Sequence, residues 1–144
     1  MKTLYLLRHA KADSGLLNDL ARDLSAKGRR QTASMGQWMS ATGIIPERII
    51  SSSAKRTKLI AKICSELIGY QRSLRFEDNL YDARSESYLD VIAVLNNRYD
   101  SVMIVGHNPA ISTMVTILTG VRLDMSPCML VCIGFTFDNW ISIN

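Results

Sequence analysis

The chain has 144 residues, of which 47% are hydrophobic and 21% charged, and its formal net charge at pH 7 is +4. This length is typical of one domain, spanning 1–144, that buries roughly two-thirds of the surface its unfolded chain would expose. Its basic residues are scattered and have no aromatic residues between them, which argues against a nucleic-acid partner. No apolar run reaches the roughly 18 residues of a membrane-spanning helix, so we expect no membrane partner.

The cysteines and the amino-terminal segment favour a reduced, cytoplasmic protein. Cys64, Cys128 and Cys132 are odd in number and contain no CxxC pair, so we expect reduced, mostly buried thiols. The amino-terminal apolar run is only about five residues and meets Arg8, so we expect no signal peptide. We expect neither a cofactor nor a metal, because no carboxylate cluster is available to hold one.

Strand-like and helix-like segments alternate from the start of the chain. The apolar run 4–7 predicts a first strand, and the polar residues 12–24 predict a long loop. Ser25 is a candidate N-cap for a helix over about 26–40, which Thr42-Gly43 ends.

The same alternation continues to the carboxyl end. Pro109 opens a helix that Gly120 closes, and residues 101–105 form the strongest strand of the chain. The other predicted elements are strands over 48–51 and 73–76, a helix from about 54 to 68, a loop over 77–84, a helix over 86–97, and strands over 129–137 and 140–143 joined by a hairpin at Asp138-Asn139. This order predicts a three-layer α/β/α fold with a mostly parallel central sheet, to which the last hairpin adds an antiparallel edge.

Four basic side chains share one position in this predicted topology. His9 and His107, the only two histidines, each follow a predicted strand. Arg8 precedes His9 directly, and Arg56 lies in the first turn of the helix after the second strand. Because the carboxyl ends of parallel strands meet at one edge, we expect all four side chains to converge there, although nearly 100 residues separate them in sequence.

Two guanidinium and two imidazole groups around one cavity are suited to a phosphoryl group. Arginine offers planar, bidentate hydrogen bonds to phosphate oxygens. The same cations disfavour a charged imidazole, so we expect His9 to be neutral and nucleophilic. The predicted chemistry is a transfer of the phosphoryl group to His9, followed by its removal by water.

Four ordered motifs resemble those of the histidine phosphatase superfamily, whose fold is phosphoglycerate-mutase-like. Within it, the chain is most similar to the short phosphohistidine phosphatases of the SixA type. The motifs are L-R-H-A-K-A (7–12), D-L-A-R-D-L-S-A-K-G (19–28), S-S-A-K-R (52–56) and V-G-H-N-P (105–109).

The resemblance implies a role for each of the four basic residues. His9 would be the phospho-accepting nucleophile, and Arg8 and Arg56 would hold the phosphoryl oxygens. His107 would complete the catalytic pocket and contact the phosphate. Only a few residues separate Tyr70 from the next strand-like stretch, so we expect no cap insertion over the pocket and a phosphohistidine-containing protein as the partner.

The chain departs from the family pattern at two places. The short relatives have proline after the arginine that matches Arg22, whereas this chain has Asp23, which puts a role of Arg22 in the site in doubt. The phosphomonoesterases of the superfamily carry a glutamate general acid after the third strand. Asp82 is the best-placed carboxylate there, and Asp78 and Glu86 compete with it.

The sequence therefore predicts a phosphatase that hydrolyses phosphohistidine on a protein. An imidazole leaves phosphorus more readily than an alkoxide, so a site with weak acid equipment suits an N–P bond. Two alternatives remain open: a small-molecule phosphomonoesterase of the same fold, and a module that recognises phosphate without turning it over.

Overall fold

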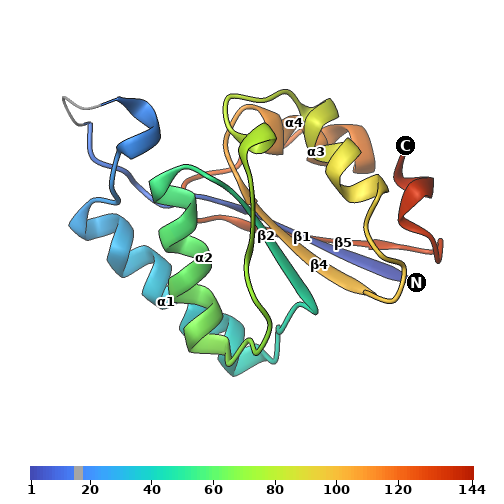
Figure 1. Cartoon of the computed structure of the whole chain (residues 1–144), viewed down its shortest axis with the longest axis horizontal. Coiled ribbons are helices and arrows are strands. Elements are labelled where there is room, and N and C mark those ends of the chain that lie inside the picture. The colour runs from blue at the N-terminus through green and yellow to red at the C-terminus, as the bar shows by residue number, and fades with distance from the viewer. Residues whose placement is uncertain (15–17) are drawn as a thin grey trace.

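A five-stranded sheet forms the centre of the molecule, with strand order β3-β2-β4-β1-β5. The computed structural model describes residues 1–14 and 18–144, so residues 15–17 of the predicted loop 12–24 lie outside the described residues. Strands β1 to β4 are parallel, and β5 runs antiparallel to β1 at the edge (Figure 1). The strands are β1 (Lys2–Arg8), β2 (Arg48–Ser52), β3 (Arg75–Glu77), β4 (Ser101–Gly106) and β5 (Leu130–Phe135).

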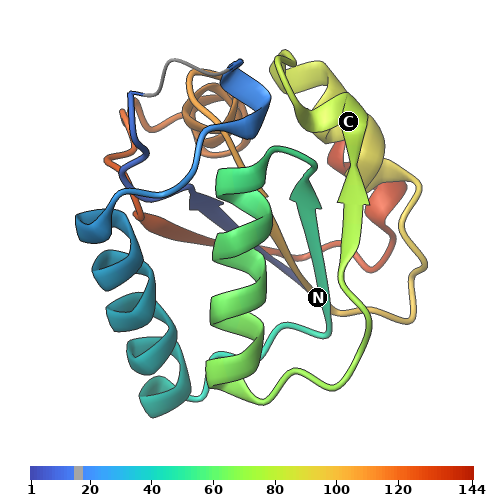
Figure 2. The same ribbon diagram turned by 60° about the vertical axis from the view of Figure 1, so that its left-hand side comes forward.

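Helices cover both faces of this sheet, which confirms the three-layer α/β/α prediction. Helices α1 and α2 pack together on one face, and α3 and α4 lie on the other (Figure 2). The helices are α1 (Ala26–Thr42), α2 (Lys55–Ile68), α3 (Ser85–Ala93) and α4 (Ala110–Thr119), with short 3₁₀ helices η1 (Asp19–Ala21), η2 (Asp78–Leu80) and η3 (Trp140–Ile143). Within the described residues, none of these helices has the length and apolarity to cross a membrane.

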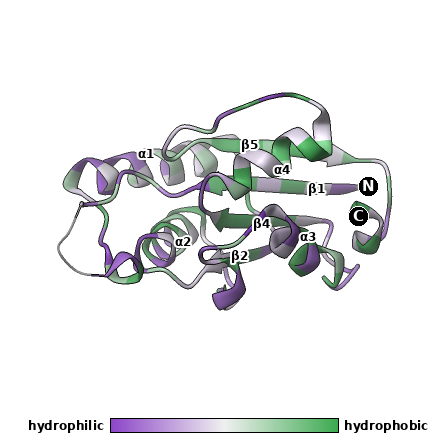
Figure 3. Cartoon of the chain, turned by 90° about the horizontal axis from the view of Figure 1, so that it is seen from above, coloured by the Kyte–Doolittle hydropathy of each residue, from purple (hydrophilic) through white to green (hydrophobic). Residues whose placement is uncertain are grey.

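Each central strand is apolar on both sides because both faces of the sheet are covered. In β1, Leu4 and Leu6 point into the core under α3 and α4, whereas Leu7 points into the core under α1 and α2. All three side chains are fully buried. The strands are accordingly mostly green in Figure 3, while α1 is largely purple. The continuous apolar run in β1 is thus a consequence of its central position.

The start of α1 is fixed by the predicted cap and by a close backbone approach. The Ser25 hydroxyl accepts from the amide of Gly28 at 3.0 Å and donates to the Lys11 carbonyl at 3.0 Å. A Cβ on Gly28 would lie 2.0 Å from that carbonyl oxygen, so only glycine lets the helix begin here. This contact holds the chain after β1 against α1.

The predicted hairpin at the carboxyl end is wrong. Residues 140–143 form the 3₁₀ helix η3 and pack against α3, so β5 has no further strand beside it. In a 3₁₀ helix, residues three apart lie on one side. Trp140 and Ile143 are buried, whereas Ile141 is 63% exposed. The alternation of apolar residues that resembled a strand is therefore the i, i+3 pattern of one helical turn.

Tyr88 links α3 to the end of β4. Its buried hydroxyl donates to the Leu80 carbonyl at 2.9 Å and accepts from the His107 amide at 3.1 Å. Its ring lies so close to Gly106 that a Cβ there would be 2.6 Å from ring and hydroxyl atoms. Gly106 thus gives Tyr88 the space to hold the backbone that carries His107.

We predict that Gly106→Ala destabilises the protein by about 1–3 kcal/mol, because the buried Tyr88 ring must move away from the added methyl group. The measurement is the free energy of unfolding from urea titration. Gly134→Ala is the matched control, since its Cβ meets open space in β5; we expect a change within about 0.5 kcal/mol. Equal stability of both variants would contradict the tight contact.

Candidate active site

The three central strands end together and bring distant parts of the chain to one edge of the sheet. Arg8 at the end of β1 is paired with Gly106 at the end of β4, and Ser51 of β2 is paired with Val105. The residues that follow these strands therefore emerge side by side. His9 and His107 meet here with ring centroids 5.3 Å apart, tilted by 58°.

The His9 ring is held in one tautomer by the backbone carbonyl of the next residue. Its Nδ1 lies 2.8 Å from the Ala10 carbonyl oxygen, which can only accept, so Nδ1 carries the proton. Nε2 consequently keeps a free lone pair. The backbone of His9 is fixed as well, because its amide donates to the Gly106 carbonyl and its carbonyl accepts from the Cys128 amide.

The His9 ring is also kept uncharged. Burial, and next the nearby guanidinium groups of Arg56, Arg8 and Arg22, lower the pKa of His9 to about 4, and its bond to Ala10 offsets this only in part. At neutral pH the imidazole is therefore a base with an available Nε2 in a cationic environment.

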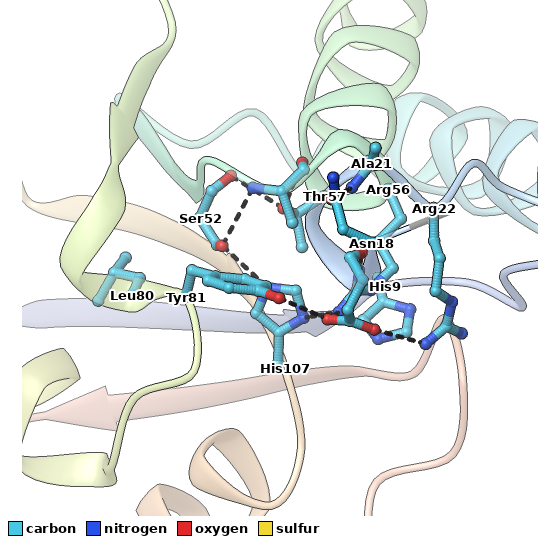
Figure 4. Close-up of polar contacts among 12 residues, drawn as sticks. His9, Asn18, Ala21, Arg22, Ser52, Arg56, Thr57, Leu80, Tyr81 and His107 are labelled. Carbon is cyan, nitrogen blue, oxygen red and sulfur yellow. Dashed lines mark hydrogen bonds and ion pairs between the residues drawn. The ribbon is translucent and has the colours of Figure 1, made fainter. Parts of the chain in front are cut away.

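His107 is oriented by two contacts on opposite sides of its ring. Its Nδ1 lies 3.4 Å from Arg56 Nη2, which can only donate, so Nδ1 accepts and Nε2–H donates to Ser52 Oγ at 2.8 Å. Burial, followed by the charge of Arg56, lowers the pKa of His107 to about 3. The edge of the Tyr81 ring packs against it at a centroid distance of 5.8 Å, and Figure 4 shows these side chains together.

Arg8 and Arg56 each have an N–H group with no partner. Arg8 Nη1 donates to the Met125 carbonyl at 2.7 Å, and Arg56 Nη1 donates to the Asp19 carbonyl at 2.7 Å. The Nε atoms of both guanidiniums are buried and make no hydrogen bond, and within the described chain they are the only buried side-chain N or O atoms of which this is true. Buried donors in folded proteins are nearly always satisfied, so these two N–H groups are candidates to bind the oxygens of an anionic ligand.

Asp19 opens the second of the four sequence motifs, which gave it no role, and it occupies a central position in the site. One carboxylate oxygen accepts from Arg22 Nη1 at 2.7 Å, and the other accepts from Arg56 Nη2 at 3.0 Å and from the Tyr81 hydroxyl at 2.7 Å. These hydrogen bonds, that of Tyr81 first, hold the pKa of Asp19 well below its usual range. Asp19 is thus ionised at neutral pH and positions two arginines.

Arg22, whose role the missing proline put in doubt, lies beside the pocket. Its Nε donates to the Asp13 carbonyl at 2.8 Å, and its charge contributes to the lowered pKa of His9. Asp23, which stands in place of the proline, forms ion pairs with Arg29 at 2.9 Å and with Lys55 at 3.4 Å. These ion pairs fix the turn that the proline would otherwise make rigid.

The three carboxylates considered for a general acid lie outside this network. Asp78, Asp82 and Glu86 are exposed, and in the described residues none forms a hydrogen bond or an ion pair through its side chain. From the same segment, Tyr81 reaches the pocket instead. No sequence pattern marks Tyr81, which follows β3 at the edge of the sheet, as a neighbour of the two histidines.

A loop after α4 supports the pocket from the other side. The Met125 carbonyl accepts from Arg8 Nη1 and also from Asn108 Nδ2, at 3.1 Å. The Asn108 side chain also accepts from Ser112 in the first turn of α4. Asn108 therefore ties the segment after His107 to the loop that holds Arg8. Among the described residues, no group of three or more His, Cys, Asp or Glu side chains could hold a metal ion.

Several known structures share this fold. The fold matches a protein of Agrobacterium tumefaciens assigned as the phosphohistidine phosphatase SixA, with a TM-score of 0.85 and 28% identity over 91% of this chain and 90% of that one. It also matches the protein histidine phosphatase SixA complexed with tungstate, with a TM-score of 0.86 and 18% identity over 99% and 91% of the two chains. The chain has the phosphoglycerate-mutase-like fold of the SixA histidine phosphatases.

The chain is also similar to a phosphatase of small molecules and to an uncharacterised protein. A mycobacterial glucosyl-3-phosphoglycerate phosphatase has the same fold, with a TM-score of 0.78 and 17% identity over 99% of this chain and 95% of that one. An uncharacterised chloroplastic protein of Arabidopsis thaliana is 27% identical over 96% of this SixA-like chain and 69% of its own length. No protein-family model matches the chain.

The electrostatics of this SixA-like pocket predict unusual histidine titrations. We expect both imidazoles to stay neutral down to about pH 5, with midpoints of about 4 for His9 and about 3 for His107. NMR of the ring nitrogens can follow both because the chain has only two histidines. His9→Gln and His107→Gln assign the two signals.

A midpoint near the ordinary histidine value of about 6.5 for either ring would contradict this environment.

The lowered pKa values of the two histidines also make the stability of the fold depend on pH. Histidines of the unfolded chain take up protons below about pH 6.5, whereas these two in the folded chain do not. The free energy of unfolding should therefore decrease as the pH falls from about 6.5 to about 4.

Proposed function

We propose that this chain is a protein phosphohistidine phosphatase that works through a phosphoryl group held covalently on His9. Its similarity to histidine phosphatases supports a hydrolase that acts on phosphoryl groups. The observation that carries the proposal is the pair of buried, unpartnered N–H groups on Arg8 and Arg56, next to a neutral imidazole with a free Nε2. An unmade hydrogen bond of this kind costs about 1–3 kcal/mol, which a bound phosphoryl group would recover.

In the first step, His9 Nε2 attacks phosphorus and the substrate's N–P bond breaks. The phosphoryl group moves to His9, and the substrate imidazole leaves with the electron pair of the broken bond and takes up a proton. Arg8 and Arg56 would hold the oxygens on which negative charge is spread in the transition state. The Nδ1–H bond to Ala10 stabilises the positive charge that His9 acquires.

In the second step, water attacks the phosphorylated His9, the new N–P bond breaks, and inorganic phosphate leaves. His107 is suited to move the proton in both steps. Its pKa is about 3 without substrate, but a dianionic phosphoryl group beside it favours the charged form and raises that pKa. With Nε2–H held by Ser52, Nδ1 is the nitrogen that would carry this proton, and it must exchange its 3.4 Å contact with Arg56 for one with the substrate. His107 would then give the proton to the leaving nitrogen and regain one from the attacking water.

The ionised state of Asp19 favours a substrate with a nitrogen leaving group over one with an oxygen leaving group. Asp19 is the carboxylate that is hydrogen-bonded into the pocket, and its low pKa leaves it without a proton to donate. A positioned acid contributes about 10²–10⁴-fold to the departure of a poor leaving group. An imidazole needs this help less than an alkoxide does, so the pocket suits phosphohistidine. The small-molecule phosphatases with this fold make sugar or glycerate phosphates the second candidate.

The deciding experiment compares substrates. We expect kcat/KM for a histidine-phosphorylated phosphotransfer protein to exceed that for each member of a panel of sugar phosphates and for 3-phosphoglycerate. EDTA should not change the rate, since no step above uses a metal. Faster turnover of any sugar phosphate would favour the second candidate, and loss of activity in EDTA would contradict a metal-independent reaction.

The covalent step predicts a trapped intermediate. Rapid quenching of the enzyme with a ³²P-phosphohistidine protein should give an acid-labile, alkali-stable label on the chain. His9→Ala should abolish the label, because no nucleophile remains at Nε2. Asp82→Asn is the control, since this exposed side chain has no bond to the pocket, and it should label normally. A wild-type chain that binds phosphate but never labels would instead be a recognition module.

A further inference from the structure

Positive charge is unevenly distributed over the two helical layers. The segment 26–68, which includes α1 and α2, holds eight of the 17 Lys and Arg residues but only two of the 13 Asp and Glu residues. The segment 69–144, which includes α3 and α4, holds five basic and eight acidic residues. The modest net charge of +4 therefore conceals one strongly basic layer.

A groove with a volume of about 450 Å³ opens on this basic layer. Lys55, Lys58 and Lys62 line it at i, i+3 and i+7 of α2, so the three ammonium groups follow one face of the helix. Its apolar wall consists of Leu59 and of Leu20, which is 44% exposed. The groove thus combines a row of cations with an exposed aliphatic surface.

Most of the charge in this row is not neutralised within the described part of the chain. Lys55 lies 3.4 Å from Asp23, which it shares with Arg29. Lys58 lies over the Phe76 ring at 5.2 Å, and neither Lys58 nor Lys62 has an ion pair among the described residues. The groove therefore has the charge that attracts carboxylates.

The groove adjoins the catalytic pocket through three shared segments. Leu20 belongs to η1, whose Asp19 binds Arg56, and η1 contacts the amino end of α2 (Figure 2). Lys55 directly precedes Arg56 in α2, and Ser53, which also lines the groove, directly follows the Ser52 that orients His107. A substrate with its phosphoryl group on His9 would place its neighbouring surface along α2.

We propose that the groove of Lys55, Lys58 and Lys62 is the docking surface for an acidic face of the phosphohistidine-bearing protein. This inference rests on the proposed function. Carboxylates beside the phosphohistidine pair with the lysine row, and apolar side chains cover Leu20 and Leu59. Complementary charge of this kind acts mainly on the rate of encounter and on the choice of partner. A free phosphorylated amino acid is too small to reach the row.

The test compares a protein substrate with a small one. In Lys58→Glu/Lys62→Glu, we expect kcat/KM for an acidic histidine-phosphorylated phosphotransfer protein to fall about tenfold or more at low salt, with most of the loss in KM. The loss should shrink at high salt, because exposed charges are screened. Activity on free phosphohistidine should stay near the wild-type value, which also shows that the variant is folded.

Arg98→Glu/Arg122→Glu is the matched control. It makes the same change in net charge at two exposed residues outside the basic layer, and should leave both activities unchanged. An equal loss in the control, an equal loss on free phosphohistidine in the lysine variant, or no loss on the protein would each overturn the docking surface. If the wild-type chain acts on free phosphohistidine but on no phosphorylated protein, the protein substrate of the proposed function fails instead.

Discussion

The parallel pairing of β1, β4 and β2 is the constraint on which the whole site depends. The strands end at one edge in fixed register, so Arg8, Ser52 and His107 come close together although they are far apart in sequence. His107 hydrogen-bonds to Ser52 there. Nothing local to His9 or His107 brings the two rings to 5.3 Å. The apolar cores on both faces of the sheet set this distance, so the stability of the fold and the geometry of the site have the same physical origin.

The pocket at this edge of the sheet contains more positive than negative charge. Burial, and after it the neighbouring cations, keeps the two imidazoles neutral. One carboxylate, Asp19, compensates part of the positive charge. The arrangement gives the pocket a positive potential that favours an anion, and it leaves the Nε2 lone pair of His9 available. Neither property is available in water, where exposed cations are screened and histidine titrates near neutrality.

The sequence predicted the positions of residues that lie at the ends of strands or the starts of helices. His9, His107, Arg8 and Arg56 each follow a strand end or open a helix, so topology alone brings them near one another. Their catalytic roles remain proposals.

Residues in irregular segments escaped prediction because no periodicity fixes the path of the chain there. Asp19 and Tyr81 both lie in or next to short 3₁₀ helices, and they meet each other across 62 positions of sequence through a single hydrogen bond. The error at 140–143 has a related cause, since four residues are too few to separate a period of two from a period of three.

The carboxylate of Asp19 also sets a threshold for occupancy of the pocket. It is tethered to the chain, so its local concentration near Arg22 and Arg56 never falls by dilution. A free anion must bring more hydrogen bonds or more charge than this resident group to gain those guanidiniums. A phosphate released in the proposed reaction would meet the same competitor for these two guanidiniums.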